Sequence, residues 1–237
     1  MAQQPTAERP TSGQATEPAG AEPAAPMPST EKGRDTRRRL MKAAAQLYEK
    51  GYANARITDI TEAAGLSAGA FYRYFEDRQQ LTRELLREMM DEMYVFIRSP
   101  FDETQPIRSV LESTRKYFEF YEAHRALLGV VVELSQTDAE VAQLWDAAKR
   151  AFNDRIVRSL ERGIAAGQMR GDLDLALAAE MLRSMTEYYA FQRFVLNGSG
   201  LSDVPLEQAT NAIAEIWISG MGLDREPATK RTAPSGA

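Results

Sequence analysis

The chain has 237 residues, of which 43% are hydrophobic, so it can bury a sizeable core in one large or two small domains. It contains no cysteine and one histidine, which excludes disulfides, thiol nucleophiles and cysteine-ligated metals and leaves little for a Ser-His-Asp set. The net charge of −5 is uneven, because residues 34–83 hold ten Lys/Arg against six Asp/Glu and residues 84–237 hold seventeen against twenty-four. A basic segment on an acidic chain favours contact with a polyanion at one end, although chance clustering would give the same pattern.

Residues 1–33 are predicted to be a disordered tail. They hold six prolines in the first thirty positions and no aromatic residue, valine or isoleucine, so they bury too little apolar surface to offset chain entropy. The N-terminus has no apolar core of a signal peptide, and the longest apolar run, 126–132, is too short to span a bilayer. We therefore expect a soluble, cytoplasmic protein without membrane contact.

The first helix is predicted at 34–51, with Leu40 and Tyr48 on one apolar stripe and Gly51 at its end. Four arginines crowd the front of this helix. Such a run is usually just a solvated face. Its place directly before the motif described next favours phosphate contact, for which Arg38 is the candidate.

Two short helices joined by a tight turn are predicted in residues 58–75. Thr58 fits the N-cap of the first helix, Ile60 and two alanines form its apolar face, and Gly65 ends it, since glycine tolerates a left-handed backbone. Ser67 fits the N-cap of the second helix, which has small residues at its front and aromatic residues at its back. This is the pattern of a helix-turn-helix, whose second helix enters a groove of DNA.

Contacts to DNA are predicted for residues on the open side of this motif. Small residues at the start of the second helix let the backbone approach base edges, whereas a tyrosine hydroxyl and an arginine fork suit phosphate oxygens. A further arginine lies in the first turn of the following helix, where free N–H groups favour an anion. Ordinary surface residues remain the alternative. The candidates are Arg38, Thr58, Ser67, Ala68, Gly69, Ala70, Tyr72, Arg73 and Arg78.

Long helices are predicted for the rest of the chain. The first of them is capped by Asp77, with Gln80 as its capping-box partner. No alternation is long enough for a strand, so we expect an all-α fold. The expected parts are a tail at 1–33, a helix-turn-helix domain at 34–83, a larger helical domain at 84–222 and a polar tail at 223–237. The expected helices are 77–98, 107–123, a short one at 126–135, and then 138–166, 173–196 and 205–221.

The segment at 34–83 resembles the N-terminal domain of TetR-family transcriptional regulators. Three features fall in register: Ala-Ala before an aromatic residue and a glycine at 44–51, the G-L-S-x-G-x-x-Y-x-Y-F run at 65–75, and a basic residue and a leucine at 78 and 81. The rest of the chain is similar only in length and helical character. Residues at 61, 68, 70 and 73 differ from those common in the family, and the last three lie on the presumed DNA face.

The resemblance implies phosphate contacts by Tyr72 and Arg78 and an inducer held between the helices of the larger domain. Met and aromatic side chains would form an adaptable apolar wall there, with a few polar groups that orient the guest. Ordinary core packing is the alternative for each of these residues. The candidates for ligand contact are Met89, Met93, Phe96, Tyr117, Tyr121, Trp145, Phe152, Tyr188, Tyr189 and Gln192.

The last two helices are predicted to form a subunit interface. Helix 173–196 is apolar nearly all round, and helix 205–221 carries Ile213, Ile216 and Trp217 along one face. A helix that is apolar on two sides needs two partners. The resemblance implies a homodimer built from these helices, although packing within one chain would also satisfy the pattern.

We therefore expect a homodimeric repressor that binds a palindromic operator in double-stranded DNA and is released by a small, largely apolar ligand. Two alternatives remain: a ligand-independent or activating DNA binder, and a helical enzyme or carrier with a vestigial DNA-binding head. No catalytic residue, cofactor or metal is predicted. His124, at a helix break, is expected to be a cap or surface residue rather than a metal ligand.

Overall fold

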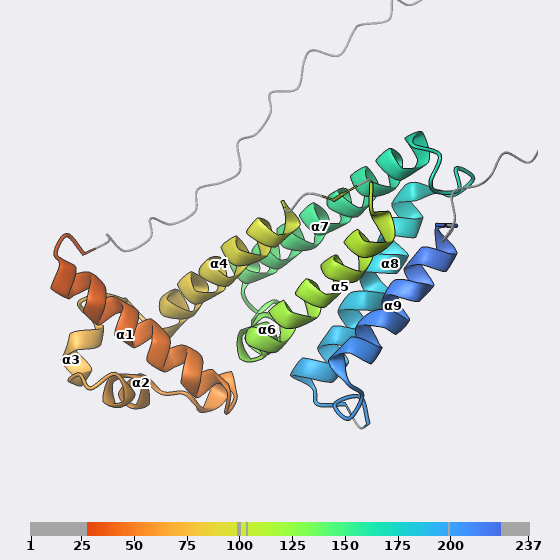
Figure 1. Ribbon diagram of the computed structural model, residues 1–237. Helices are drawn as coiled ribbons and strands as arrows, with labels where there is room; N and C mark the ends of the chain where they lie inside the picture. The colour runs from red at the N-terminus through yellow and green to blue at the C-terminus, as the bar shows by residue number, and fades with distance from the viewer. Residues whose placement is uncertain (1–27, 99–100, 103, 199, 224–237) are drawn as a thin grey trace, which may run out of the picture.

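The computed structural model describes residues 28–98, 101–102, 104–198 and 200–223. Within these ranges the protein is all-α, as predicted, and contains no strand (Figure 1). A 3₁₀ turn, η1, spans Tyr52–Asn54, and a π-helical turn, η2, spans Phe191–Val195. The α-helices are α1 (Glu31–Tyr48), α2 (Ile57–Ala63), α3 (Ala68–Phe71), α4 (Arg78–Ile97), α5 (Pro106–Ala123), α6 (Arg125–Leu134), α7 (Ala139–Ala165), α8 (Leu175–Ala190) and α9 (Leu206–Gly220).

Helices α1, α2 and α3 and the first turns of α4 form a small head at one end of the molecule (Figure 1). Phe71 and Phe75 are buried at its centre, as their spacing predicts. The hydroxyl of Tyr48 lies 2.6 Å from that of Thr82, which joins α1 to α4. Burial raises the pKa of Tyr48 to about 12, so this hydroxyl stays protonated.

The first helix begins at Glu31, earlier than expected, so residues 31–33 are not part of a disordered tail. Thr30 is the N-cap, and its hydroxyl accepts a hydrogen bond from the backbone N–H of Gly33 at 3.1 Å. Glu31 also places a negative charge in the first turn, where the helix dipole favours it. The remainder of the expected tail, 1–27, lies outside the described residues.

The N-cap expected at Thr58 is a second correction, since α2 begins at Ile57 and Arg56 occupies the cap position. The carboxylate of Asp59 accepts a hydrogen bond from the N–H of Arg56 at 3.1 Å and so stabilises this earlier start. At the other end Gly65 has φ +65, and the N–H of Leu66 donates to the carbonyl of Thr61 at 2.8 Å. The left-handed glycine thus makes the predicted turn.

Helix α4 runs without a break from the head into the larger body (Figure 1). Asp77 caps it by accepting from the N–H of Gln80 at 2.7 Å, as predicted. The side chain of Gln80 reaches one residue further back than a capping box requires, to the N–H of Glu76 at 2.7 Å. Because one helix crosses the expected domain boundary at 83/84, the head is held rigidly against the start of the body.

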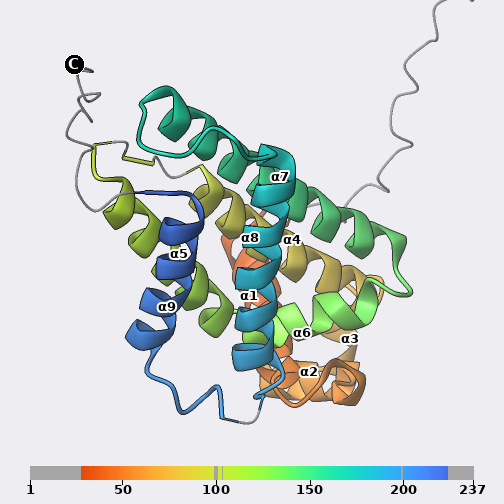
Figure 2. The ribbon, with the colours of Figure 1, turned by 90° about the vertical axis from the view of Figure 1, so that its right-hand side faces the viewer.

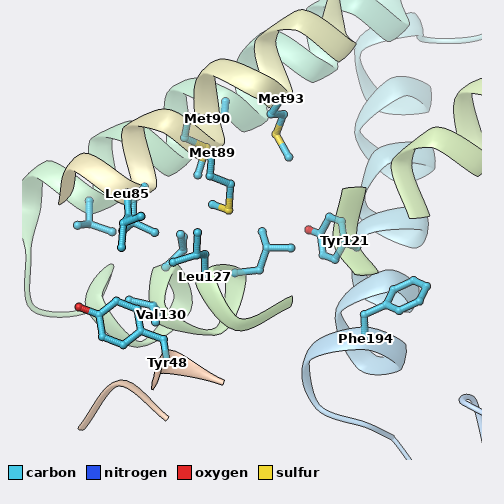
Figure 3. Close-up of a cluster of buried hydrophobic side chains, with 14 of the residues drawn as sticks. Tyr48, Leu85, Met89, Met90, Met93, Tyr121, Leu127, Val130 and Phe194 are labelled. Atoms are coloured by element: carbon cyan, nitrogen blue, oxygen red, sulfur yellow. The ribbon is translucent and has the colours of Figure 1, made fainter. Parts of the chain in front are cut away.

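The body consists of α4 to α9. Helices α4 and α8 both pack on α7, and α9 packs on α5. Figure 2 looks onto the face that α8 and α9 form. The short helix α6 contacts α1, α4 and α7, and its Leu127 and Val130 lie in the same buried cluster as Met89 and Met93 of α4 (Figure 3).

The C-terminal end of the body extends to Leu223, which is buried rather than part of a polar tail. Gly222 has φ +65, and the N–H of Leu223 donates to the carbonyl of Ile218 at 3.0 Å, which turns the chain back over α9. Residues 224–237 lie outside the described ranges. None of the helices in the described ranges is long and apolar enough to cross a membrane.

Candidate DNA-binding surface and ligand cavity

The front of α3 is open and nearly bare. Ser67, Ala68 and Gly69 are exposed, and Ala70 is half-buried. A Cβ atom built on Gly69 would meet no other atom within 4 Å. Nothing in the described chain therefore stands between this backbone and an approaching partner, and the free N–H groups at the helix start face outward.

Tyr72 and Arg73 extend this open surface at the end of α3. The side chain of Tyr72 is 63% exposed although it is aromatic, and its ring meets the buried ring of Phe71 edge-on, with 5.5 Å between centroids. Phe71 thus fixes the direction in which the Tyr72 hydroxyl points. Arg73 is exposed beside it.

The arginines of α1 divide into two kinds. Arg37 is buried, forms an ion pair with Glu84 and lies 5.0 Å from the centre of the Phe75 ring, and Arg39 donates to the carbonyl of Ala64 at 2.5 Å. Both hold the head together. Arg38 is exposed and reaches Asp35 at 2.7 Å, so it can exchange this solvated partner for a phosphate.

Arg78 and Thr58 have different surroundings. The guanidinium of Arg78 donates to the carbonyls of Tyr52 at 2.8 Å and Ala55 at 2.5 Å and lies 4.1 Å from the centre of the Tyr52 ring. It therefore supports η1 from within the head, and its phosphate contact stays a prediction. Thr58 is exposed in the first turn of α2.

A small cavity, more enclosed than the hollows described below, lies in the body, at the end of the bundle away from the head. Its volume is about 50 Å³. Most of its wall comes from α5 and α7, and the rest comes from α8, α9 and segments between or after the helices. The lining residues are Phe101, Val110, Ser113, Thr114, Tyr117, Phe152, Arg155, Ile156, Ser159, Leu160, Met169, Thr186, Trp217, Met221 and Leu223.

Two of the predicted ligand contacts, Tyr117 and Phe152, lie in this wall. Their rings stack nearly parallel, with centroids 5.0 Å apart and an angle of 8° between the planes. Phe96 of α4 lies directly behind them, with its ring centroid 6.1 Å from that of Tyr117 and 5.8 Å from that of Phe152. The third residue that it meets is Arg155, whose guanidinium is 5.2 Å from the Phe96 ring.

Three other predicted contacts, Tyr121, Trp145 and Tyr188, line a shallower hollow of about 320 Å³ between α7 and α8. Arg183 and Glu187 form an ion pair at its edge. Burial raises the pKa of Glu187, which the charge of Arg183 opposes. The hydroxyl of Tyr117 donates to that of Tyr121 at 3.4 Å, so these two tyrosines separate the hollow from the small cavity.

The remaining predicted contacts lie away from the wall of the small cavity. Met93 is in the core shown in Figure 3, and Met89 lies there too and borders a cleft between α1, α4 and α6. Tyr189 packs on Phe118, with ring centroids 5.6 Å apart. Gln192 donates to the hydroxyl of Tyr188 at 2.8 Å. Met89 and Met93 lie away from the cavity because α4 faces α7 and α6 rather than the cavity itself.

Sequence reasoning missed several wall residues, of which Arg155 and Trp217 matter most. Arg155 follows Phe152 by one helical turn and precedes Ser159 by another, so a charged residue stands in the inward stripe of α7. This charged residue within an otherwise apolar stripe was the signal in the sequence that could have identified Arg155 as a wall residue. Trp217, assigned to the subunit interface, instead points inward and donates from its indole nitrogen to the hydroxyl of Thr186 at 3.2 Å.

The outer face of α8 and α9 carries exposed apolar side chains. Leu177, Met181 and Tyr188 follow each other along one side of α8, and Ile216 lies on α9; each is more than half exposed. Ile213, expected on this face, is buried within the chain, where α9 packs on α5. We define these four exposed residues as the α8–α9 stripe.

Two family models match the chain. Residues 40–85 match the model described as bacterial regulatory proteins, tetR family, and residues 110–221 match the model of the C-terminal domain of the transcriptional regulator EthR. The first match covers the helix-turn-helix and the start of α4, and the second covers the α8–α9 stripe and the cavity wall except Phe101 and Leu223.

Named relatives and solved structures agree with these two family matches. The chain is 26% identical over 202 residues to the HTH-type transcriptional repressor KstR2 of Rhodococcus jostii (strain RHA1), which covers 79% of this chain and 92% of the relative. It shares its fold with Salmonella enterica GusR, with a TM-score of 0.62, 19% identity and coverage of 82% and 98% of the two chains. It also shares its fold with Bacillus subtilis FadR in complex with stearoyl-CoA, with a TM-score of 0.58, 21% identity and coverage of 77% and 98%.

Proposed function

The chain belongs to the TetR family of transcriptional regulators, which are DNA-binding proteins rather than enzymes, and on that premise we propose that it is a ligand-released repressor acting as a homodimer. In this proposal the head binds a palindromic operator in double-stranded DNA in the cytoplasm. A small, largely apolar molecule that enters the body cavity then releases the protein from DNA.

The open front of α3 supports the DNA-binding part of the proposal. Ser67 to Ala70 bring backbone and small side chains to the bases, and Tyr72 and Arg73 reach phosphates on either side. Arg38 supplies a further cation from α1. Thr58 lies where the start of α2 would meet the DNA backbone.

The observation that carries the ligand response is the contact of Phe96 with the cavity wall. Phe96 belongs to α4, which also holds the head, and it packs on Tyr117, Phe152 and Arg155. A guest that pushes these residues apart must move Phe96 and tilt α4. The guest needs only to bind the tilted state more tightly than the DNA-bound state.

The α8–α9 stripe supports assembly with a second copy. The four apolar side chains of the stripe are more than half exposed, and a two-fold axis would place the same stripe on both sides of the contact. Two heads related by such an axis can enter successive major grooves, about 34 Å apart. A palindromic operator follows from that symmetry.

The relatives support repression and an apolar guest. The name of KstR2 describes a repressor, and FadR was solved with stearoyl-CoA, a compound with a long apolar chain. The apolar lining of the cavity in this chain suits a guest with an apolar body.

The experiment begins with the full-length protein and sheared DNA from its own genome. Bound fragments are recovered and sequenced, and the enriched site is then used in fluorescence anisotropy. We expect an inverted repeat bound by a dimer. Ligands are sought by thermal stabilisation of the free protein, and a hit should lower operator affinity. Stabilising compounds that never affect DNA binding would favour a ligand-independent regulator.

Replacing Phe96 tests the route from the cavity to the head. In Phe96→Ala we expect a hit compound still to raise the melting temperature but to release operator at least about tenfold less effectively, because α4 has lost its contact with the wall. Val95→Ala is the matched control, since Val95 is the residue just before Phe96 in α4 and is 71% exposed. An unchanged release in Phe96→Ala would place the coupling elsewhere.

A further inference from the structure

We propose that Met169 is the end stop of the ligand cavity and sets the length of the apolar chain that a guest can place inside it. This inference rests on the proposed function in taking the cavity as the ligand site. It deepens that function by naming the residue that selects the guest by length. The alternative is that Met169 only fills the core and that a guest ends elsewhere along the wall.

The two ends of the cavity differ in what closes them. Toward the head, the stacked rings of Tyr117 and Phe152 form the wall, and Phe96 lies behind them. At the other end α5 begins and α7 and α9 end (Figure 1), and the wall there comes from segments outside the helices. The wall residues from these segments are Phe101, Met169, Met221 and Leu223. A guest that lies along α5 and α7 would therefore meet these side chains with the end that points away from the head.

Met169 stands between the cavity and the surface at this end. Its side chain lines the cavity and is half-buried, whereas Met221 and Leu223 are buried. The N–H of Arg170 donates to the carbonyl of Met221 at 3.1 Å, so the segment that carries Met169 is joined to the end of α9. Methionine is unbranched and has a flexible side chain, which suits it to fill an irregular gap of this kind.

Gly163 determines where the tip of the Met169 side chain lies. Gly163 is buried in the last turn of α7, and a Cβ atom built on it would lie 2.6 Å from Sδ and 2.8 Å from Cε of Met169. A larger residue at this position would displace the tip. The sulfur and the methyl group of Met169 therefore rest on the bare backbone of α7, while the same side chain forms part of the cavity wall.

This arrangement places a limit on the length of a guest. Each methylene group that a chain buries in the cavity should tighten binding about fourfold. Once the chain reaches Met169, a further methylene group finds no apolar space, and the gain should stop. Replacing Met169 with alanine removes Cγ, Sδ and Cε, so the gain should continue for about three more carbons.

The test is a chain-length series with the full-length protein in the absence of DNA. Isothermal titration measures the dissociation constants of the straight-chain 1-alkanols from butanol to dodecanol. For the wild type we expect affinity to rise with chain length up to a break point. The chain has two tryptophans, so Trp145→Phe leaves Trp217 of the wall, whose fluorescence then reports whether an alkanol occupies this cavity.

The variants assign the break point to a residue. Met169→Ala should move the break point about three carbons longer. Met93→Ala removes the same atoms from a buried residue away from the wall and should leave the break point unchanged. Circular dichroism checks that each variant is folded. If Met169→Ala unfolds, Met169→Val makes the same test, with an expected shift of about one carbon.

Each contrary outcome has a distinct meaning. An unchanged break point in a folded Met169 variant, or an equal shift in Met93→Ala, would overturn the proposal; the response of Trp217 would still identify the cavity as a ligand site. Affinity that rises without a break up to dodecanol would overturn the proposal too. No binding of any alkanol would overturn both the proposal and the apolar guest of the proposed function. Binding to an operator is measured separately and is not affected by these results.

Discussion

Arginine residues in this chain perform different tasks because their partners differ. Arg39 donates to a main-chain carbonyl at the end of α2, and Arg78 donates to a main-chain carbonyl in the loop before α2. Arg38 and Arg73 are exposed, which suits the DNA contacts proposed for them. Replacing the inward group should therefore cost stability of the head, whereas replacing the outward group should cost DNA affinity alone.

The bare position at Gly69 gives the sharpest prediction for a single residue. Gly69→Leu should fold normally, since its Cβ meets nothing within 4 Å and leucine is the better helix former by somewhat less than about 1 kcal/mol. If α3 enters the groove, the added side chain blocks the approach, and operator affinity should fall at least about tenfold, the lower range for a lost base contact.

Thermal unfolding and anisotropy measure the two effects separately. Ala165→Leu, which adds the same side chain at an exposed position at the far end of α7, is the control and should change neither. Full operator binding by Gly69→Leu would show that this part of α3 does not approach the bases.

At the scale of the helices, features set by neighbouring residues could be predicted better than features set by contacts between distant segments. The turn at Gly65 and the cap at Asp77 follow from neighbouring residues, so they could be read from the sequence. The start of α2 was misplaced because Asp59 stabilises an earlier first turn than the hydroxyl of Thr58 would. Which side of α9 faces α5 depends on packing between distant segments, and for that reason Ile213 was assigned to the wrong face.

The α8–α9 stripe gives a prediction at this scale. Met181→Asp places a charge at the centre of the proposed two-fold contact, where removing it from water would cost several kcal/mol. Light scattering should show a folded monomer with unchanged helical circular dichroism. Val95→Asp, the same kind of change at an exposed apolar residue of α4, should remain dimeric. A dimeric Met181→Asp, or a monomeric wild type, would contradict the proposed interface.

For the molecule as a whole, the all-α architecture and the head could be predicted, whereas most residues that line the cavity could not. Its wall combines α5, α7 and α9, which are far apart in the sequence and whose crossing sets which stripe faces inward. Periodicity identified inward residues such as Met93 and Phe152 alike, but only the packed structure separates core from wall. Arg155 was overlooked because charged residues on helices are usually solvated.

Coupling between the two ends of α4 predicts reciprocity. If a ligand lowers operator affinity by some factor, saturating operator must raise the dissociation constant of that ligand by the same factor. Titration of a hit compound with and without operator measures this directly, and an unrelated duplex of equal length is the control. Identical ligand affinity in both conditions would contradict release by tilting of α4.

The narrowness of the cavity has a consequence for the time course of binding. A volume of about 50 Å³ is well below the roughly 150 Å³ of an engineered cavity that accepts benzene, so we expect α5 and α7 to move apart before a larger guest enters. The opening of the cavity would then precede the binding of the guest. In stopped-flow mixing, the observed association rate should level off at high ligand concentration, at the rate of opening, rather than rise linearly. The speed with which such a repressor responds would then be set by the protein and not by the amount of ligand.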